Sequence, residues 1–323
     1  MSEVQQQVLP GNVGLPSLSV RLPMPDIRPW RAGNTALPGV WTLVAAEAGP
    51  HLVVSALVHG NEIAGALLLA RWLREGLRPR RGRLTLVFAN LAAFDTFDAA
   101  DPTTSRFIDE DMNRLWAPEV LAAGRRSVEL DRARALVPVV RQADVLLDLH
   151  SMLWPSDPLF LSGMSAPARA LGQEIGTPPL VVGDEGHAAG LRMIDHARFQ
   201  GEGRALLLEA GPHWQPQTLA QMEAAAARVL RSLGMAAEDA PLPPEETPPP
   251  GRAALVTRTV TAASEAFVFL REFRGCEVIP RRNTLIALDG EAEIRTPHDD
   301  CLLVMPSPRV MRGHTAVRLA KFA

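Results

Sequence analysis

Short runs of continuously apolar residues recur along the first two thirds of the chain, each bounded by polar residues or glycine. Such runs are typical of β-strands that are covered on both faces, because neither face then carries polar side chains. We predict strands at residues 40–46, 52–58, 84–89, 145–149, 159–161 and 205–208. Residues 1–38 are instead rich in proline and glycine, so we expect an arm there, with one short strand at residues 18–22.

Between these runs, the apolar positions recur with the period of an α-helix. We predict helices at residues 62–75, 128–141 and 217–233. The first is apolar over most of its surface and should be buried, whereas the other two are amphipathic. Strands that alternate with helices predict an α/β fold, in which helices flank a mostly parallel or mixed sheet.

The composition changes at residues 241–250, which are mostly proline. Such a stretch cannot continue a helix and favours an extended, semi-rigid spacer. Further strands, with no helices between them, are predicted at residues 253–261, 266–271, 284–287, 302–305 and 316–319. We therefore predict an α/β domain at residues 1–240, a proline-rich linker at residues 241–250 and a smaller, β-rich C-terminal domain at residues 251–323.

The charge balance narrows the set of functions. The 323 residues include 33 lysines and arginines against 36 aspartates and glutamates, a net charge of −3 that argues against a nucleic-acid partner.

The most apolar stretch, residues 52–73, is interrupted by His59, Asn61 and Glu62, so we expect no membrane span. The first residues lack the pattern of a secretory signal. We expect a soluble, cytoplasmic protein, and whether it forms a homo-oligomer stays open.

Two groups of polar residues lie at the ends of predicted strands. His59 and Glu62 lie where the strand at residues 52–58 gives way to a helix, and residues three apart in a helical turn share a face. His150 ends another strand, at the sheet edge where open α/β folds bind their ligands. Two imidazoles, one carboxylate and an open position form the ligand set of a catalytic zinc site. Asp148, two residues before His150, could orient its imidazole, or it could be a helix N-cap or a surface residue.

A long segment with little periodicity follows the strand at residues 84–89 and contains Arg106, Asn113 and Arg114. Long loops of this kind are often functional. Because arginine binds carboxylates through two parallel hydrogen bonds, the segment is a candidate clamp for an anionic substrate. The alternative is that both arginines pair on the surface with the acidic residues at 109–111.

Glu209 ends the apolar strand at residues 205–208 and precedes Ala-Gly-Pro. A carboxylate at the end of a buried strand is costly unless it is satisfied or used, and near a metal ion Glu209 could act as a general base. Simpler alternatives stay open at this point. Glu209 could be exposed at the strand end, Glu62 could only complement a helix N-terminus, and His59 could be an ordinary loop residue.

Taken together and in this order, these clusters resemble the succinylglutamate desuccinylase/aspartoacylase family, which is related to the zinc carboxypeptidases. The resemblance spans residues 52–213, and the β-rich C-terminal domain suits the family's second domain, which partly covers the active-site entrance. The matching motifs are His59-Gly-Asn-Glu62, Arg106 with Asn113-Arg114, Asp148-Leu-His150 and Glu209-Ala-Gly-Pro212.

The resemblance implies a zinc-dependent hydrolase that cleaves the amide bond of an N-acyl amino acid, with residues 1–240 as its catalytic domain. His59, Glu62 and His150 match the ligands of one zinc ion per chain. Glu209 matches the general base that deprotonates zinc-bound water.

The same resemblance implies roles for the long segment. Arg106 matches the residue that stabilises the tetrahedral oxyanion together with zinc, and Asn113 and Arg114 match the pair that grips the free carboxylate of the small-molecule substrate. Two departures concern only the substrate. The chain contains no tyrosine for a substrate contact that family members use, and Ser151-Met152 follows where aspartoacylases carry polar residues.

Two alternative functions use the same residues. Carboxypeptidase-like cleavage of a C-terminal residue would use the same grip on a carboxylate by Asn113 and Arg114. A non-catalytic metal-binding or ligand-sensing protein could keep the fold, but it would not need Glu209 beside the ligand trio.

Overall fold

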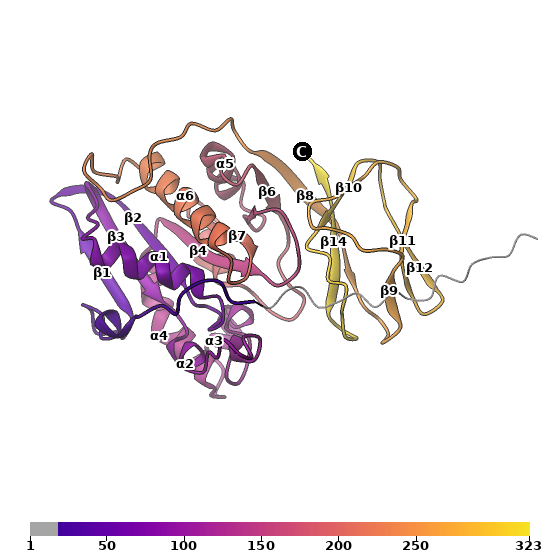
Figure 1. The fold of residues 1–323 in the computed structure, drawn as a ribbon, viewed down its shortest axis with the longest axis horizontal. Coiled ribbons are helices and arrows are strands. Elements are labelled where there is room, and N and C mark those ends of the chain that lie inside the picture. Colours follow the sequence, from indigo (N-terminus) through magenta and orange to yellow (C-terminus); the bar gives the residue numbers. More distant parts are fainter. Residues whose placement is uncertain (1–18) are drawn as a thin grey trace, which may run out of the picture. The chain divides into compact units, whose positions relative to one another are not determined.

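Contacts within the chain divide the residues that the computed structural model describes, 19–323, into two units. The first, here called the α/β unit, comprises residues 19–153 together with Pro158–Ala254. The second, the β unit, comprises Trp154–Asp157 together with Leu255–Ala323. Figure 1 labels their helices and strands.

The sheet of the α/β unit runs in the order β1-β3-β2-β4-β7-β5-β6, followed by the first residues of β8. From β1 to β6, neighbouring strands are parallel except where β1 pairs with β3 and β5 with β7. The sheet is therefore mixed and mostly parallel, which confirms the predicted fold class. The strand bounds are β1 Val40–Val44, β2 Glu47–Ala56, β3 Arg81–Phe88, β4 Val145–Met152, β5 Leu159–Leu161, β6 Leu180–Gly183, β7 Arg204–Pro212 and β8 Arg252–Thr261.

Helices cover this sheet. α1 (Ile63–Arg74) and α6 (Pro216–Ser232) lie side by side (Figure 1), and Arg71 on α1 forms an ion pair with Glu223 on α6. Both helices share one hydrophobic core with the strands, whereas no buried residue of α4 (Val128–Gln142) belongs to that core. The two amphipathic helices and the buried one are thus formed where the apolar period predicts them. No helix among residues 19–323 has the length and apolar character needed to cross a membrane.

The structure forms elements that the periodicity does not predict. They include two short strands of the β unit, at residues 278–279 and 292–295, and, in the α/β unit, β6 and α5 (Ala166–Ile175). Pro167 and Gly172 make this stretch look like a loop, yet both fit the helix. The proline lies in the first turn, where a backbone N–H has no partner within the helix, so the missing N–H removes no hydrogen bond. A Cβ at Gly172 would lie 2.8 Å from a methyl group of Val181, so glycine allows α5 to approach β6 closely.

The expected strand at residues 18–22 is wrong over residues 19–22, where no strand forms, and residue 18 lies outside the described residues, as does most of the first half of the expected arm. The backbone N–H of Arg21 donates one hydrogen bond to the Trp214 carbonyl, at 3.0 Å. Pro23 and Pro25 follow, and they have no N–H with which to extend a ladder.

The segment between β3 and α4 contains only short helical turns, in agreement with its weak periodicity. They are α2 Leu91–Asp95, η2 Thr104–Arg106, η3 Met112–Arg114 and α3 Pro118–Leu121, and η1 Arg28–Trp30, η4 Met193–Asp195 and η5 Ala197–Phe199 lie elsewhere in the α/β unit.

The β unit contains strands and no helix among its described residues. β8 is followed in its sheet by β14, β13 and β10, and β13 pairs antiparallel with both β14 and β10. A separate antiparallel sheet has the order β12-β11-β9. Ile286, Leu303 and Val317 lie in their shared hydrophobic core. The strand bounds are β9 Phe267–Phe269, β10 Val278–Ile279, β11 Leu285–Asp289, β12 Ala292–Arg295, β13 Cys301–Val304 and β14 Thr315–Phe322.

Candidate metal centre and active site

The candidate site lies at the carboxyl ends of three adjacent parallel strands of the α/β unit, β2, β4 and β7. His59 follows the end of β2, His150 lies near the end of β4, and Glu209 lies near the end of β7. His150 and Glu209 are paired in register on neighbouring strands. Paired residues point to the same face of a sheet, so the Glu209 side chain lies beside that of His150. Glu209 is 8 % exposed, which excludes the alternative of a solvent-exposed strand end.

The turn from β2 to α1 brings His59 and Glu62 together. It needs glycine at Gly60, because a Cβ there would lie 2.4 Å from the backbone of Ala93. Helix α1 begins at Ile63, one residue later than predicted, so Glu62 is its N-cap residue. The Glu62 side chain makes no capping hydrogen bond and instead contacts His59 and His150, so it does more than complement the charge of the helix N-terminus.

The carboxylate of Glu62 is shared by two imidazoles. Its Oε1 lies 2.8 Å from Nδ1 of His59, and its Oε2 lies 3.1 Å from Nδ1 of His150. All three side chains are buried, and their candidate ligand atoms lie within 4.8 Å of one another. The structure therefore brings together the predicted trio as a group that could hold a metal ion.

The outer nitrogens of both imidazoles are held by carboxylates. Nε2 of His150 lies 2.8 Å from Oδ2 of Asp148, and Nε2 of His59 lies 3.0 Å from Oδ1 of Asp111. Such contacts fix the orientation of metal-binding imidazoles and leave the other nitrogen to face the ion. Because Nδ1 of each ring faces Glu62, the donor set fits a metal ion bound by two imidazoles and one carboxylate.

Burial and neighbouring charges shift the pKa values of Glu62 and His150 in opposite directions. Burial by itself would raise the pKa of Glu62, but the charges and hydrogen bonds of His59 and His150 hold that pKa well below its usual range. Burial would lower the pKa of His150, but Asp148 and Glu62 raise it well above its usual value. Without a metal ion, the group is thus stabilised as a carboxylate paired with a positively charged imidazole. A cation bound between the same atoms would replace the proton charge.

Asp111 links the arginines of the long segment to His59. Oδ2 of Asp111 lies 3.3 Å from a guanidinium nitrogen of Arg106 and 3.7 Å from one of Arg114. Oδ1 of Asp111 contacts Nε2 of His59. Burial would raise the pKa of Asp111, but His59 and the two arginines hold it well below its usual range. Arg106 also lies 3.4 Å from Oε1 of Glu62, so its guanidinium is at the edge of the trio.

The sequence also allowed the acidic residues at 109–111 to pair with Arg106 and Arg114. Of these three acids, only Asp111 contacts the two arginines. Asp109 accepts the backbone N–H of Val128 at 2.8 Å, and Glu110 pairs with Arg125. Arg106 and Arg114 therefore share one carboxylate between two guanidinium groups.

Asn113 is buried, and its side-chain oxygen accepts the backbone N–H of Met193 at 2.9 Å. This bond ties η3 to η4 and leaves the amide nitrogen as the donor that can face a ligand. Arg114 donates to the Asn113 carbonyl at 2.7 Å, which further fixes the two predicted substrate-binding residues relative to each other.

Glu129 holds the loop that carries Arg106, a role that sequence reasoning missed. Its fully buried carboxylate accepts the consecutive backbone N–H groups of Ile108, Asp109 and Glu110 at 2.7, 3.0 and 3.3 Å. The side chain of Asn90 donates a fourth bond, at 3.0 Å. The only signal in the sequence is a carboxylate on the apolar side of a predicted amphipathic helix.

Sequence reasoning also missed the pairing of His213 with Ser151. Ser151 Oγ lies 2.6 Å from Nδ1 of His213, and the Ser151 backbone N–H donates to Oε2 of Glu62 at 2.9 Å. Burial lowers the pKa of His213 to about 4, so its imidazole is neutral near pH 7. The feature of the sequence that could have indicated a role for His213 is its position just after Glu209-Ala-Gly-Pro212, at the end of β7.

Comparisons with known proteins identify the family of the chain and proteins of similar fold. The family described as "Succinylglutamate desuccinylase/Aspartoacylase catalytic domain" matches residues 48–233. A crystal structure of succinylglutamate desuccinylase from Vibrio cholerae has a similar fold, with a TM-score of 0.69 and 20% identity over 88% of this chain and 86% of that one. A structure of the enzyme of the same name from Vibrio parahaemolyticus has a TM-score of 0.66 and 17% identity over the same shares, 88% and 86%.

Two curated relatives match shorter stretches. A probable aspartoacylase of Parasynechococcus marenigrum (strain WH8102) is 34% identical over 98 residues, which are 29% of this chain and 31% of the relative. An N-acyl-aromatic-L-amino acid amidohydrolase (carboxylate-forming) of Xenopus laevis is 31% identical over 109 residues, 31% of this chain and 33% of the relative. The chain thus covers only about a third of the length of these relatives.

The substitution Glu129→Gln tests the role of this carboxylate in the loop. An amide carries an NH₂ group in place of one oxygen, so it would face backbone donors that it cannot satisfy. We expect a loss of about 1–3 kcal/mol in the free energy of unfolding and faster hydrogen exchange at the amides of Ile108, Asp109 and Glu110. Glu119→Gln, at an exposed position on α3, is the matched control and should change neither. Unchanged exchange in Glu129→Gln would contradict the role.

Proposed function

Because the chain belongs to the succinylglutamate desuccinylase/aspartoacylase family, we propose that it is a zinc-dependent hydrolase that cleaves the amide bond of an N-acyl amino acid. The observation that carries the proposal is the buried convergence of His59, Glu62 and His150, with Glu209 in register beside His150. A ligand trio alone would serve a binding protein. A carboxylate held next to it is what hydrolysis needs in addition.

His59, Glu62 and His150 hold the zinc ion in this proposal, and the imidazoles are oriented by Asp111 and Asp148. Three protein ligands leave a position open for water and substrate, as in catalytic zinc sites. The ion supplies Lewis acidity, which polarises the substrate carbonyl and makes water easier to deprotonate.

Glu209 is the general base, because its carboxylate lies beside His150 at the same edge of the sheet. It takes a proton from the attacking water and then donates that proton to the amine that leaves, so the products are a carboxylate and an amine. Arg106 contributes a guanidinium at the edge of the trio, where negative charge develops on the carbonyl oxygen. Such a donor typically contributes about 2.7–4 kcal/mol to transition-state stabilisation.

Asn113 and Arg114 grip the free carboxylate of the substrate. The guanidinium can bind it through two parallel bonds, and the contact of Asn113 with Met193 holds the amide in place. The name of the Xenopus laevis relative supports an N-acyl amino acid as substrate. The acyl group and the amino acid have to be found with a panel of N-acetyl, N-succinyl and aromatic N-acyl amino acids.

Metal analysis tests the ligand trio. Protein purified without a histidine tag and loaded with zinc should hold about one ion per chain, and His59→Ala should hold far less because one of three ligands is lost. His314→Ala, at an exposed position in the β unit, removes an imidazole without touching the trio and should bind as wild type does. Equal zinc content in His59→Ala and wild type would reject this site.

The substitution Glu209→Gln tests the general base. It should leave the zinc content unchanged and lower kcat by about 10²–10⁴-fold, the usual range for loss of a general base. Glu202→Gln, at an exposed position just before β7, is the control and should keep full turnover. A Glu209→Gln enzyme with normal kcat would assign the base to another residue, and one without zinc would make Glu209 part of the metal site.

The substitution Arg114→Ala tests the carboxylate grip. KM should rise for N-acyl amino acids with a free carboxylate and stay the same for the corresponding amides, because only the former meet the guanidinium. Arg126→Ala, which removes an exposed surface arginine, should change neither KM. An equal rise for both substrate types would contradict the grip. Faster cleavage of blocked dipeptides than of N-acetyl or N-succinyl amino acids would instead favour carboxypeptidase-like activity.

A further inference from the structure

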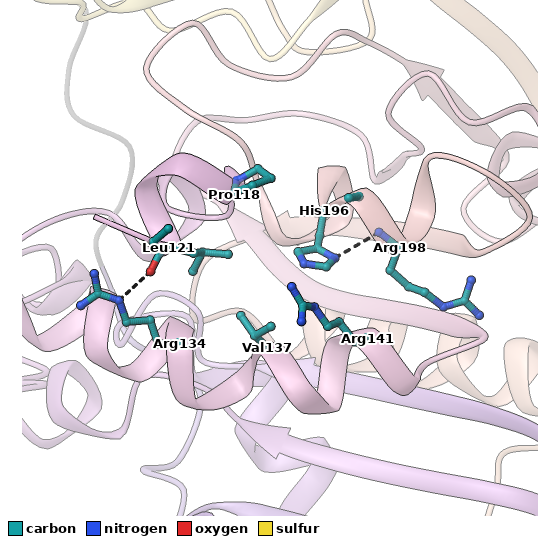
Figure 2. A pocket seen from close by; sticks show the side chains of 9 residues that line it. Pro118, Leu121, Arg134, Val137, Arg141, His196 and Arg198 are labelled. Carbon is teal, nitrogen blue, oxygen red and sulfur yellow. Dashed lines mark hydrogen bonds between the residues drawn. The ribbon is translucent and has the colours of Figure 1, made fainter. Parts of the chain in front are cut away.

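A cavity of about 700 Å³ in the α/β unit contains none of the residues assigned to the metal centre or the substrate grip (Figure 2). Its walls are α3, one face of α4 and the segment 196–198. This volume is in the range of sites that bind small molecules.

The lining combines an apolar wall with positive charge. Leu121 and Val137 supply apolar surface, whereas Arg134, Arg141 and Arg198 are cationic. No acidic residue lines the cavity. The lining therefore favours an anion that has an apolar part.

The three arginines are not equivalent. Arg134 donates to the carbonyl of Leu121 at 2.8 Å, and Arg198 lies 3.2 Å from a carboxylate oxygen of Asp144. The side chain of Arg141 has no hydrogen bond or ion pair with any residue between 19 and 323. Its guanidinium points toward His196 in Figure 2. Arg141 is thus the guanidinium that remains for a ligand.

His196 supplies a second donor. It is only 4 % exposed, and its Nδ1 accepts the backbone N–H of Arg198 at 3.1 Å. A neutral imidazole that accepts at Nδ1 carries its hydrogen on Nε2. Within the described part of the chain, no group accepts this hydrogen. Burial, and then the charge of Arg141, lower the pKa of His196, which keeps the ring in this neutral form near pH 7.

We propose that this cavity binds a small organic carboxylate, whose carboxylate group lies between the guanidinium of Arg141 and Nε2–H of His196 and whose apolar body packs against Leu121 and Val137. A planar carboxylate can accept from both donors at once. A neutral molecule of the same shape would lose the charged contact with Arg141.

Residues that immediately precede His196 in the chain contact the predicted substrate grip. η4, which ends one residue before His196, donates the Met193 N–H to Asn113, and Trp116 donates its backbone N–H to Leu191 at 3.2 Å. The ring of Trp116 also contacts that of His196 edge to face, with centroids 6.3 Å apart. A carboxylate that bridges α4 and His196 therefore restrains the segment that presents Asn113, and it should strengthen substrate binding. This coupling rests on the proposed function, whereas binding to the cavity does not.

Calorimetry on the purified chain, without added zinc, tests the binding site, with 4-phenylbutyrate and its neutral amide, 4-phenylbutyramide, as probes. We expect 4-phenylbutyrate to bind the wild type and the control Arg74→Gln, which removes an exposed arginine on α1. Arg141→Gln should weaken this binding about tenfold or more, and 4-phenylbutyramide should bind weakly to all three proteins. Val137→Asp, which places a negative charge in the cavity, should also abolish binding of the carboxylate.

Each contrary result overturns the proposal. No binding to the wild type would reject the site, and so would equal binding by Arg141→Gln. Loss of binding in Arg114→Ala, which leaves the cavity intact, would place the probe in the substrate grip instead.

Kinetics test the coupling separately. With an N-acyl amino acid substrate, 4-phenylbutyrate should lower KM in wild type and leave KM unchanged in Arg141→Gln, whose turnover without the probe should be that of wild type. An increase of KM in both proteins would mean competition at the active site and would reject the coupling. Because calorimetry needs no turnover, failure of the proposed function and failure of the carboxylate site give different results.

Discussion

The buried carboxylate of Glu62 is the constraint on which the site depends. An ionised carboxylate without partners would be very costly in the interior, and here its oxygens face the imidazoles of His59 and His150 and accept the N–H of Ser151. The three partners come from the end of β2 and the end of β4. The parallel pairing of these strands and the tight turn at Gly60 are therefore needed to satisfy one charge.

The pairing of carboxylates with cationic or ionisable side chains continues in the residues around Glu62. Asp148 and Asp111 hold the outer nitrogens of the two imidazoles, and Asp111 also holds the two arginines of the long segment. Each of these carboxylates touches a cationic or ionisable partner, so charge is balanced locally although the chain is net negative. A metal ion bound between these carboxylates would be one more cation in this network, and the arrangement could therefore hold it.

Carboxylates also give the long segment its shape without regular secondary structure. Glu129, which lies on α4, accepts hydrogen bonds from three consecutive backbone N–H groups of the loop. In a helix or a sheet, backbone carbonyls would accept such bonds. Asn113 makes a similar contact to the backbone of η4. The loop is thus held at one point by a side chain of α4 and at another by its own Asn113, which accepts a backbone N–H of η4.

The fold class and the three residues that could hold a metal ion were both predictable from the sequence. Apolar runs and helical periods reflect burial over a few neighbouring residues, and His59, Glu62 and His150 are recognisable because each lies at the end of such a run. The loop-like composition of Pro167 and Gly172 concealed α5, because the fit of a glycine against β6 depends on a partner that the local pattern does not contain. Only the tertiary structure decided the contacts of Asp111 with His59, of Ser151 with His213 and of Asn113 with Met193, which are 52, 62 and 80 residues apart. The physical reason is that these bonds depend on how distant loops meet at the sheet edge, and no periodicity along the chain records where they meet.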